Sequence, residues 1–165
     1  MRDWLIRPYQ QRDRARIWEL TVAGFDGVSI EQRIDRRWSG VGSMDWAERK
    51  CLEVMDDLDR HPEGCFVAEV AGEVVGYVTT TVHEERQQGR IPNLAVDVRL
   101  RGRGLGRALI QAALADFRRR GLRVARIETL EDNAVGRHLY PSLGFQEVAR
   151  QVHYAMPLDP DDRDD

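Results

Sequence analysis

Residues 93–107 read Asn-Leu-Ala-Val-Asp-Val-Arg-Leu-Arg-Gly-Arg-Gly-Leu-Gly-Arg, and a helical pattern begins immediately afterwards. This stretch predicts a strand, a glycine-rich turn that carries arginines, and the N-terminus of a helix. Glycines let several backbone N–H groups converge on one point, and the positive end of the helix dipole lies behind them. The stretch therefore predicts an anion site for a phosphate-bearing ligand.

The spacing of the glycines excludes two common phosphate loops. The dinucleotide motif requires Gly-x-Gly-x-x-Gly, but Arg107 stands where the third glycine should be. A Walker loop ends in Gly-Lys-Ser/Thr, which the turn lacks, so a nucleotide-binding regulator is disfavoured. The turn instead reads Arg-Gly-Arg-Gly-Leu-Gly over residues 101–106. For these six residues alone, a plain strand-to-helix turn with solvated arginines remains the alternative.

A second informative stretch, residues 128–145, follows one predicted helix later. Asn133 stands at an expected helix N-cap, Tyr140 follows seven residues later, and Gly144-Phe145 comes after it. Together the two stretches, about residues 91–145, resemble the coenzyme A half of the GNAT family of N-acetyltransferases. The core is most similar to bacterial enzymes that acetylate the N-terminus of ribosomal proteins.

The resemblance implies a set of residues that hold acetyl-coenzyme A as co-substrate, with no metal. Backbone groups of Leu94, Ala95 and Val96 would meet the acetyl and pantetheine arm. Asn133 would bind the pantetheine arm, although a role as N-cap alone is an equal alternative. The pyrophosphate would be held by the turn, at Arg101, Gly102, Arg103, Gly104, Leu105, Gly106 and Arg107.

The resemblance also implies catalytic roles for two residues. Tyr140 would be the general acid that protonates the departing thiolate, and a bland core tyrosine is the alternative. Pro141 disfavours helical geometry at Tyr140, which predicts that its hydroxyl is aimed differently from the family norm. Glu128 aligns with the family's base, but it could instead pair with a nearby arginine. Water or a weaker acid, Glu84, Glu85 or Asp97, is the other candidate for the base.

The order of patterns along the chain predicts the fold class. We expect an α/β fold with a mixed, mostly antiparallel sheet, one parallel strand–helix–strand crossover and helices on both faces. Strands are predicted at 5–7, 65–70, 73–82, 91–98 and 123–130, and one or two more at 145–156. Helices are predicted at about 10–23, 47–58, 105–120 and 133–143, and only a helical turn or two around 30–38.

Composition limits the other possibilities. Residues 1–158 are expected to form one domain, and the run 159–165, with five acids and one arginine, a disordered tail. The rest of the chain is near neutral, which argues against nucleic acid. No apolar run approaches the roughly 18 residues of a membrane span. Cys51 and Cys65 are expected to be buried free thiols in the cytoplasm, and the histidines and cysteines show no metal-ligand spacing.

The sequence therefore predicts an enzyme that moves an acetyl group directly from acetyl-coenzyme A to a primary amine. The acceptor, a small-molecule amine or a peptide or protein N-terminus, cannot be read from it. Trp38, Trp46 and the glycine-rich stretch 24–43 are candidates for the wall of an acceptor pocket, and simple packing of these residues is the alternative. A non-catalytic sensor of coenzyme A or acyl-coenzyme A is the alternative function, and a homodimer is left open.

Overall fold

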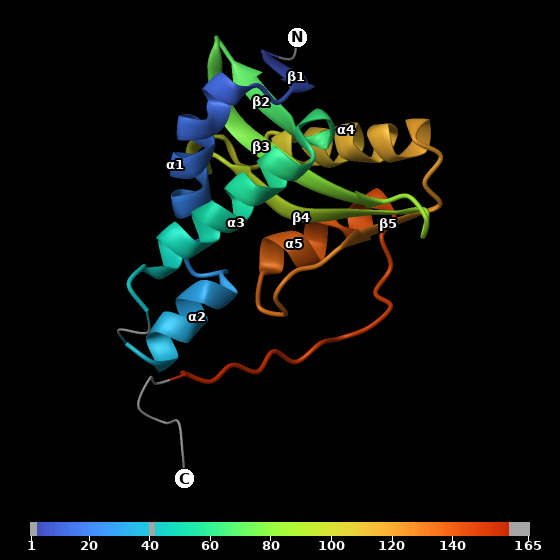
Figure 1. The fold of residues 1–165 in the computed structure, drawn as a ribbon. Coiled ribbons are helices and arrows are strands. Elements are labelled where there is room, and N and C mark those ends of the chain that lie inside the picture. The colour runs from blue at the N-terminus through green and yellow to red at the C-terminus, as the bar shows by residue number, and fades with distance from the viewer. Residues whose placement is uncertain (1–2, 40–41, 159–165) are drawn as a thin grey trace.

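The computed structural model describes residues 3–39 and 42–158. The acidic run 159–165, predicted to be a tail, lies outside the described residues, as do residues 1–2 and 40–41. Figure 1 shows a twisted sheet with helices packed on its two faces.

The sheet has five strands in sequence order, β1 (Trp4–Pro8), β2 (Phe66–Val70), β3 (Glu73–His83), β4 (Gln88–Val96) and β5 (Val124–Ile127). Neighbouring strands are antiparallel except β4 and β5, which are parallel. The parallel pair is joined by α4 (Leu105–Arg119), which is the crossover that the sequence predicts. The predicted fold class is therefore confirmed.

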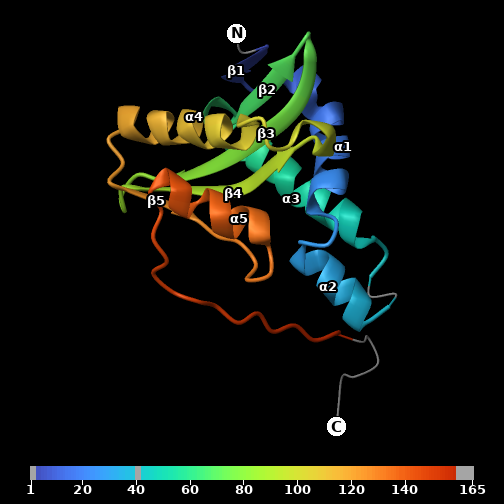
Figure 2. The same cartoon turned by 180° about the vertical axis from the view of Figure 1, so that it is seen from behind.

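Two cores cover the two faces of the sheet. On one face, α1 (Arg14–Phe25) and α3 (Trp46–Arg60) pack against the sheet, and Figure 2 shows α4 on the other. The apolar side chains of these helices are buried in the two cores. The first core includes Ile17, Leu20, Val54, Leu58, Val67 and Tyr77, and the second includes Phe66, Val78, Leu105, Leu109, Ala113 and Phe117. Cys51 and Cys65 are buried free thiols, as predicted.

Two short helices complete the fold, α2 (Ile30–Arg37) after α1 and α5 (Ala134–Leu139) after β5. The prediction of one or two strands over 145–156 is wrong, because residues 145–158 form no helix or strand. The segment runs extended and away from the sheet (Figures 1 and 2). Alternating apolar residues favour an extended chain, but a strand also needs a neighbouring edge to pair with, and none lies beside this segment.

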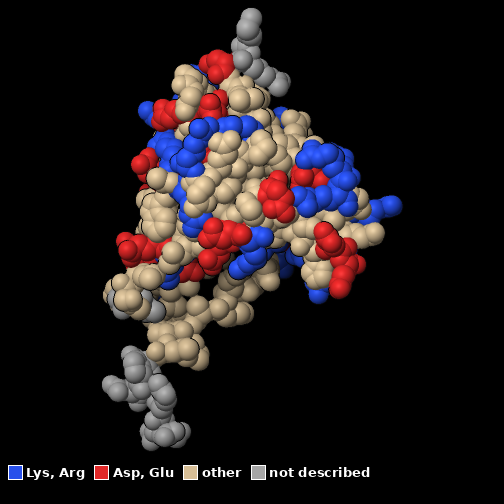
Figure 3. Space-filling view, turned by 45° about the horizontal axis from the view of Figure 1, so that its top comes forward, with Lys and Arg blue, Asp and Glu red and all other residues tan. Residues whose placement is uncertain are grey.

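Two features, a membrane-spanning helix and a metal-binding cluster, are absent from the described residues. Over residues 3–39 and 42–158, no helix is long and apolar enough to cross a membrane. The same residues contain no cluster of three or more His, Cys, Asp or Glu side chains that could hold a metal ion. On the face seen in Figure 3, acidic and basic side chains are interspersed.

Strands β4 and β5 are paired only along the first half of β4. Their pairing runs from Gln88–Val124 to Ile91–Ile127 and then stops. The next residue, Pro92, has no N–H to give to a ladder, and the β3–β4 register also shifts between Thr79 and Thr81. The second half of β4 therefore has β3 on one side and an open edge on the other.

Asp97 fixes the end of β4 where the glycine turn begins. Its carboxylate accepts hydrogen bonds from Arg16 of α1 at 3.0 Å and from the side chain of Arg99 at 2.6 and 3.0 Å. The backbone N–H of Arg99 donates to it as well, at 3.0 Å. The Arg99 side chain holds the pKa of Asp97 well below its usual range, although burial opposes this, and the Arg99 N–H and Arg16 lower the pKa further. Asp97 is therefore a charged anchor between α1 and the turn.

Replacing Asp97→Asn should lower the free energy of unfolding by about 1 kcal/mol at pH 7, because charged hydrogen bonds to two arginines are lost. A lowered folded-state pKa contributes stability above the unfolded value of about 3.9, and this is lost as the pH falls. The difference from the native chain, measured by urea denaturation, should thus be constant from pH 8 to 5 and narrow below about pH 4.

The matched control is Asp59→Asn, since Asp59 pairs with Arg14 at 2.5 Å but is 61% exposed. We expect this change to cost less than that at Asp97. Equal losses in the two variants, or a difference for Asp97 that does not depend on pH, would contradict the anchoring role.

Candidate active site

A cleft of about 890 Å³ opens where β4 and β5 separate. The structure brings all the predicted site residues to this cleft except Arg103, whose side chain does not line it. The lining comes from the β4 edge, the glycine turn, the β5–α5 connection and α5. Residues from the α1–α2 connection and α3 close the other end.

The glycine turn forms a cradle of backbone N–H groups. Gly102 and Gly104 have φ angles of +79° and +84°, which side chains rarely adopt, and Gly104 is the N-cap of α4. The cap brings no side chain, so the first N–H groups of α4 have no intrahelical partner and face the cleft. Arg101 lines the cleft, and the described residues offer it no ion-pair partner. These features fit an anionic pyrophosphate.

The Arg107 side chain lines the cleft, as predicted, but it also bonds to another segment of the chain. It lines the cleft, but its guanidinium donates to the Ser142 hydroxyl at 2.6 Å and to the Ser142 carbonyl at 3.2 Å. The side chain therefore ties α4 to the short 3-10 turn Pro141–Leu143 that follows α5. Its backbone N–H remains at the N-terminus of α4, where the prediction needs it.

The open edge of β4 leads from the turn toward the centre of the cleft. Leu94, Ala95 and Val96 lie beyond the last β4–β5 pair, so their backbone groups on the β5 side are not engaged by a strand in the described structure. Gly106 keeps this path narrow but open. A Cβ there would meet Leu139 at 3.5 Å and Leu94 at 3.8 Å, so any larger side chain would extend into the gap between β4 and α5.

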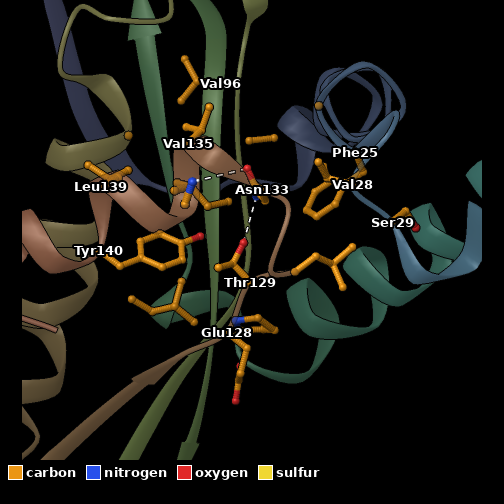
Figure 4. A pocket seen from close by; sticks show the side chains of 18 of the residues that line it. Phe25, Val28, Ser29, Val96, Glu128, Thr129, Asn133, Val135, Leu139 and Tyr140 are labelled. Carbon is orange, nitrogen blue, oxygen red and sulfur yellow. Dashed lines mark hydrogen bonds between the residues drawn. The ribbon is translucent and has the colours of Figure 1, made fainter. Parts of the chain in front are cut away.

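Asn133 caps α5 as the sequence predicts. Its side-chain oxygen accepts from the Gly136 N–H at 3.4 Å, and its amide group donates to the Thr129 hydroxyl at 2.9 Å (Figure 4). A Cβ on Gly136 would lie 2.7 Å from the Thr129 hydroxyl, so this contact requires glycine. Thr129 was not singled out from the sequence, since nothing in its local pattern distinguishes it from an ordinary strand residue.

Tyr140 points its hydroxyl into the cleft (Figure 4). The predicted distortion by Pro141 is wrong: Tyr140 has helical angles of φ −66° and ψ −47°, and its N–H still donates to Gly136. The helix ends at Leu139, and Pro141 starts a new turn, where a missing N–H costs little. The ring packs edge-on against Phe145, with centroids 6.3 Å apart. Burial raises the pKa of Tyr140 to about 12, and the charge of Glu128 adds to the rise.

Glu128 lies at the end of β5 and is paired with two arginines. Its carboxylate accepts from Arg90 at 2.9 Å and from Arg126 at 3.3 Å, and its side chain is 40% exposed. Figure 4 shows the carboxylate directed away from the Tyr140 ring. The arginine pairing that the sequence left open is therefore present, and it coexists with a position on the cleft wall.

The weaker candidates for the base lie elsewhere. Asp97 is held by Arg16 and Arg99, and its lowered pKa makes it a poor proton acceptor. Glu84 and Glu85 lie in the turn between β3 and β4 and do not line the cleft.

The end of the cleft away from the glycine turn, called the acceptor end below, was not predicted residue by residue. Phe25 lines it from the end of α1, Val28 and Ser29 from the α1–α2 connection, and Lys50 and Glu53 from α3. Lys50 lies 4.5 Å from the centroid of the Phe25 ring and pairs with Glu53 at 2.9 Å. The Ser29 hydroxyl is buried and has no hydrogen-bond partner within the described chain. Trp38 and Trp46, expected as walls, do not line the cleft.

Comparisons with known proteins place the chain among acetyltransferases. A family model described as the acetyltransferase (GNAT) family matches residues 28–145. A mycothiol acetyltransferase of Thermomonospora curvata is 38% identical over 152 residues, which cover 84% of this chain and 50% of that protein. The chain spans half or less of the length of the mycothiol acetyltransferases that it matches.

Two solved structures share the fold. Ard1 of Thermoplasma volcanium has a TM-score of 0.67 and 26% identity, and the match covers 90% of this chain and 86% of that one. The ribosomal-protein-S18-alanine N-acetyltransferase of Escherichia coli has a TM-score of 0.61 and 20% identity, with coverage of 88% and 79%. At that identity, the second match shows likeness of fold alone.

The glycine turn generates a prediction that separates ligand binding from stability. Gly104→Ala places a side chain at φ +84° in the cradle, and Gly121→Ala imposes the same strain at φ +74° beyond the other end of α4. Both should lower the melting temperature. Only Gly104→Ala should weaken coenzyme A binding, about tenfold or more, in a thermal-shift titration. Equal affinities for coenzyme A in the two variants would contradict the turn as the anion site.

Proposed function

The chain belongs to the GNAT family of acetyltransferases, and on this premise we propose that it transfers the acetyl group of acetyl-coenzyme A directly to a primary amine. The family match confirms the resemblance on which the predicted activity rests. The single observation that carries the proposal is the cleft itself. It joins an N–H cradle, an open strand edge and a partly buried tyrosine in one continuous space.

The donor would lie along the open edge of β4. The turn from Gly102 to Arg107 would hold the pyrophosphate, and Leu94 to Val96 would receive the arm that carries the thioester. Such an arrangement fixes the thioester beside the acceptor, and proximity alone supplies much of the rate of a two-substrate reaction. The side-chain amide of Asn133 is already bonded to Thr129. Asn133 would therefore contribute by holding the start of α5 in place beside the pantetheine arm.

In the reaction, the amine nitrogen forms a bond to the thioester carbonyl carbon, the C–S bond breaks, and coenzyme A leaves with the electron pair of that bond on sulfur. Tyr140 would donate its hydroxyl proton toward this sulfur. A pKa of about 12 keeps the phenol protonated at neutral pH, but it also makes complete transfer to a thiolate of pKa about 8.5 unfavourable. Tyr140 would therefore stabilise the developing charge by a hydrogen bond, and solvent completes the proton transfer.

The proton lost by the amine needs a separate acceptor. Glu128 lines the cleft and aligns with the residue that acts as the base in the family. We propose that it accepts the amine's proton through a water molecule. Its pairing with Arg90 and Arg126 fixes its position on the cleft wall, but it also engages both carboxylate oxygens. Proton removal would thus contribute less than the positioning of the two substrates.

The acceptor is proposed as a small-molecule amine or a peptide N-terminus. The likeness of the core to ribosomal-protein acetyltransferases supports a peptide, whereas the names of the mycothiol relatives support a small molecule. The acceptor end of the cleft combines Phe25 and Val28 with the carboxylate of Asp26, and with Glu31 and Glu53, which pair with Arg49 and Lys50. This mixture suits a cationic amine attached to an apolar or polar body.

The deciding experiment is release of free thiol from acetyl-coenzyme A, measured across a panel of amines and peptides with N-terminal alanine, glycine or serine. We expect turnover with at least one class, and mass spectrometry of that product should show one acetyl group added. Binding of coenzyme A without thiol release for any acceptor would contradict catalysis and favour a sensor.

Tyr140→Phe should lower kcat by about tenfold to a hundredfold, since one donor to the leaving sulfur is lost. The dissociation constant for coenzyme A should change less than twofold, because the ring and its contact with Phe145 remain. Steady-state rates together with calorimetric titration check both numbers. An unchanged kcat would remove Tyr140 from the reaction.

Glu128→Gln should change the acidic limb of the pH–rate profile, because it removes the carboxylate proposed to accept the amine's proton. Glu84→Gln in the β3–β4 turn serves as the comparison, and its profile should match that of the native chain. If the profile of Glu128→Gln is also unchanged, the base is water or another group.

A further inference from the structure

Lys50 is the only lysine among the 25 lysine and arginine residues of the sequence. It lines the cleft from α3, at the acceptor end, and it is only 8% exposed. Lysine is among the residues least often buried to this degree, and buried lysines are normally paired. No step of the reaction proposed above uses this amine.

The contacts that hold the Lys50 ammonium would suit an arginine equally well. Its Nζ atom lies 4.5 Å from the centroid of the Phe25 ring and donates to Glu53 at 2.9 Å. Arginine is the more frequent cation over an aromatic ring, and it also pairs with carboxylates. The two residues differ in chemistry, because a guanidinium stays protonated whereas the amine of lysine can lose a proton and become a nucleophile. The single lysine of the chain therefore lies where that difference has a consequence, in the cleft proposed to hold a thioester.

Short contacts connect Lys50 with the strand edge proposed to hold the thioester. Phe25, whose ring meets the ammonium, is the last residue of α1, and Gly24 precedes it. A Cβ on Gly24 would lie 2.8 Å from the Ala95 Cβ, so the end of α1 packs directly on β4. Figure 4 shows Phe25 and Tyr140 on opposite sides of the pocket. Lys50, the β4 edge and Tyr140 therefore border one continuous space.

The Lys50 side chain is free to move within that space. Its partner Glu53 lies on the next turn of α3, and the Glu53 side chain is 51% exposed. An ion pair with a solvent-exposed partner is screened and contributes little stability. The lysine side chain is also a flexible four-carbon stem. The ammonium can thus leave Glu53 and turn toward the β4 edge without a change in the fold.

We propose that the enzyme acetylates its own Lys50, within one chain, when acetyl-coenzyme A is bound and no acceptor occupies the cleft. This inference rests on the proposed function, because the acetyl group comes from the same bound donor. Lys50 supplies the group that the reaction requires, a primary amine, at the acceptor end. Because the donor and this amine belong to one complex, proximity favours it over an amine in solution.

The step uses only the bound donor and the lysine. The Lys50 ammonium first loses a proton to solvent, with Glu53 as the carboxylate to which it already donates. The neutral nitrogen then forms a bond to the thioester carbonyl carbon, the C–S bond breaks, and the electron pair of that bond leaves on sulfur. The nitrogen gives up a second proton to solvent, and the sulfur takes up one. The products are Nε-acetyl-lysine at position 50 and coenzyme A as the free thiol.

Acetylation would change the acceptor end and would limit itself. An acetylated lysine carries no charge, so it loses both the attraction to the Phe25 ring and the pair with Glu53. The transfer would end after one acetyl group per chain, because the sequence has no second lysine. In the absence of an acceptor, each chain should therefore release one equivalent of thiol.

The test incubates the native chain with acetyl-coenzyme A and no acceptor, and it follows free thiol and intact mass together. We expect a burst of one equivalent of thiol per chain and a mass gain of one acetyl group. Cleavage after arginine releases residues 50–60 as one peptide, which should carry that group. Lys50→Arg keeps a cation beside Phe25 and Glu53 but has no amine, so it should show neither the burst nor the mass gain.

Two results would overturn the inference in distinguishable ways. A native chain that stays unmodified at Lys50 but acetylates an amine of the acceptor panel would overturn self-acetylation and leave the proposed function intact. A chain that does neither would overturn both.

Arg118→Lys supplies a matched control within the same molecule. Arg118 is exposed near the end of α4 and does not line the cleft. In this variant, the amine at position 50 should be acetylated about tenfold or more faster than the amine at position 118, since only the first lies beside the bound donor. Equal rates would indicate chemical acetylation by free acetyl-coenzyme A. A rate constant that rises with enzyme concentration would indicate transfer between chains, and either result would overturn the proposal.

Discussion

The parallel ladder between β4 and β5 ends at the Ile91–Ile127 pair, where Pro92 cannot donate an N–H to continue it. Beyond this pair, β4 has a free edge that faces the cleft. The open edge, the glycine turn beyond it and the N-terminus of α4 all follow from a β–α crossover that is paired at only one end. The cleft of about 890 Å³ is the space left by this incomplete pairing.

The two ends of the cleft differ in charge, and Tyr140 lies between them. The turn supplies N–H groups and Arg101, while the acceptor end supplies Asp26, together with Glu31 and Glu53, which pair with Arg49 and Lys50. In the proposed reaction, an anionic donor would bind at the turn, a cationic acceptor would bind near Asp26, and the two would meet near the partly buried phenol. Glu128 belongs to neither end, because Arg90 and Arg126 already balance its charge.

The conformation of the glycine turn and the N-cap at Asn133 could be predicted from the sequence because their signals are local. A glycine at φ +84° or an asparagine at a helix N-cap is dictated by residues within a few positions of it. The acceptor end could not be predicted, since Ser29 and Glu53 meet there only through the packing of α1 and α3. The strands predicted at 145–156 failed for a related reason: alternation indicates an extended chain, but pairing depends on a neighbour that the local pattern does not contain.

The central claim is that coenzyme A binds along the β4 edge and the glycine turn. An amide chemical-shift titration with coenzyme A, monitored by NMR, tests it directly. The largest changes should fall on residues 94–96, 102–107 and 133–140, and the α2 helix, Ile30–Arg37, should change little. Changes that avoid the turn, or that concentrate on α2 and β1, would contradict the claim.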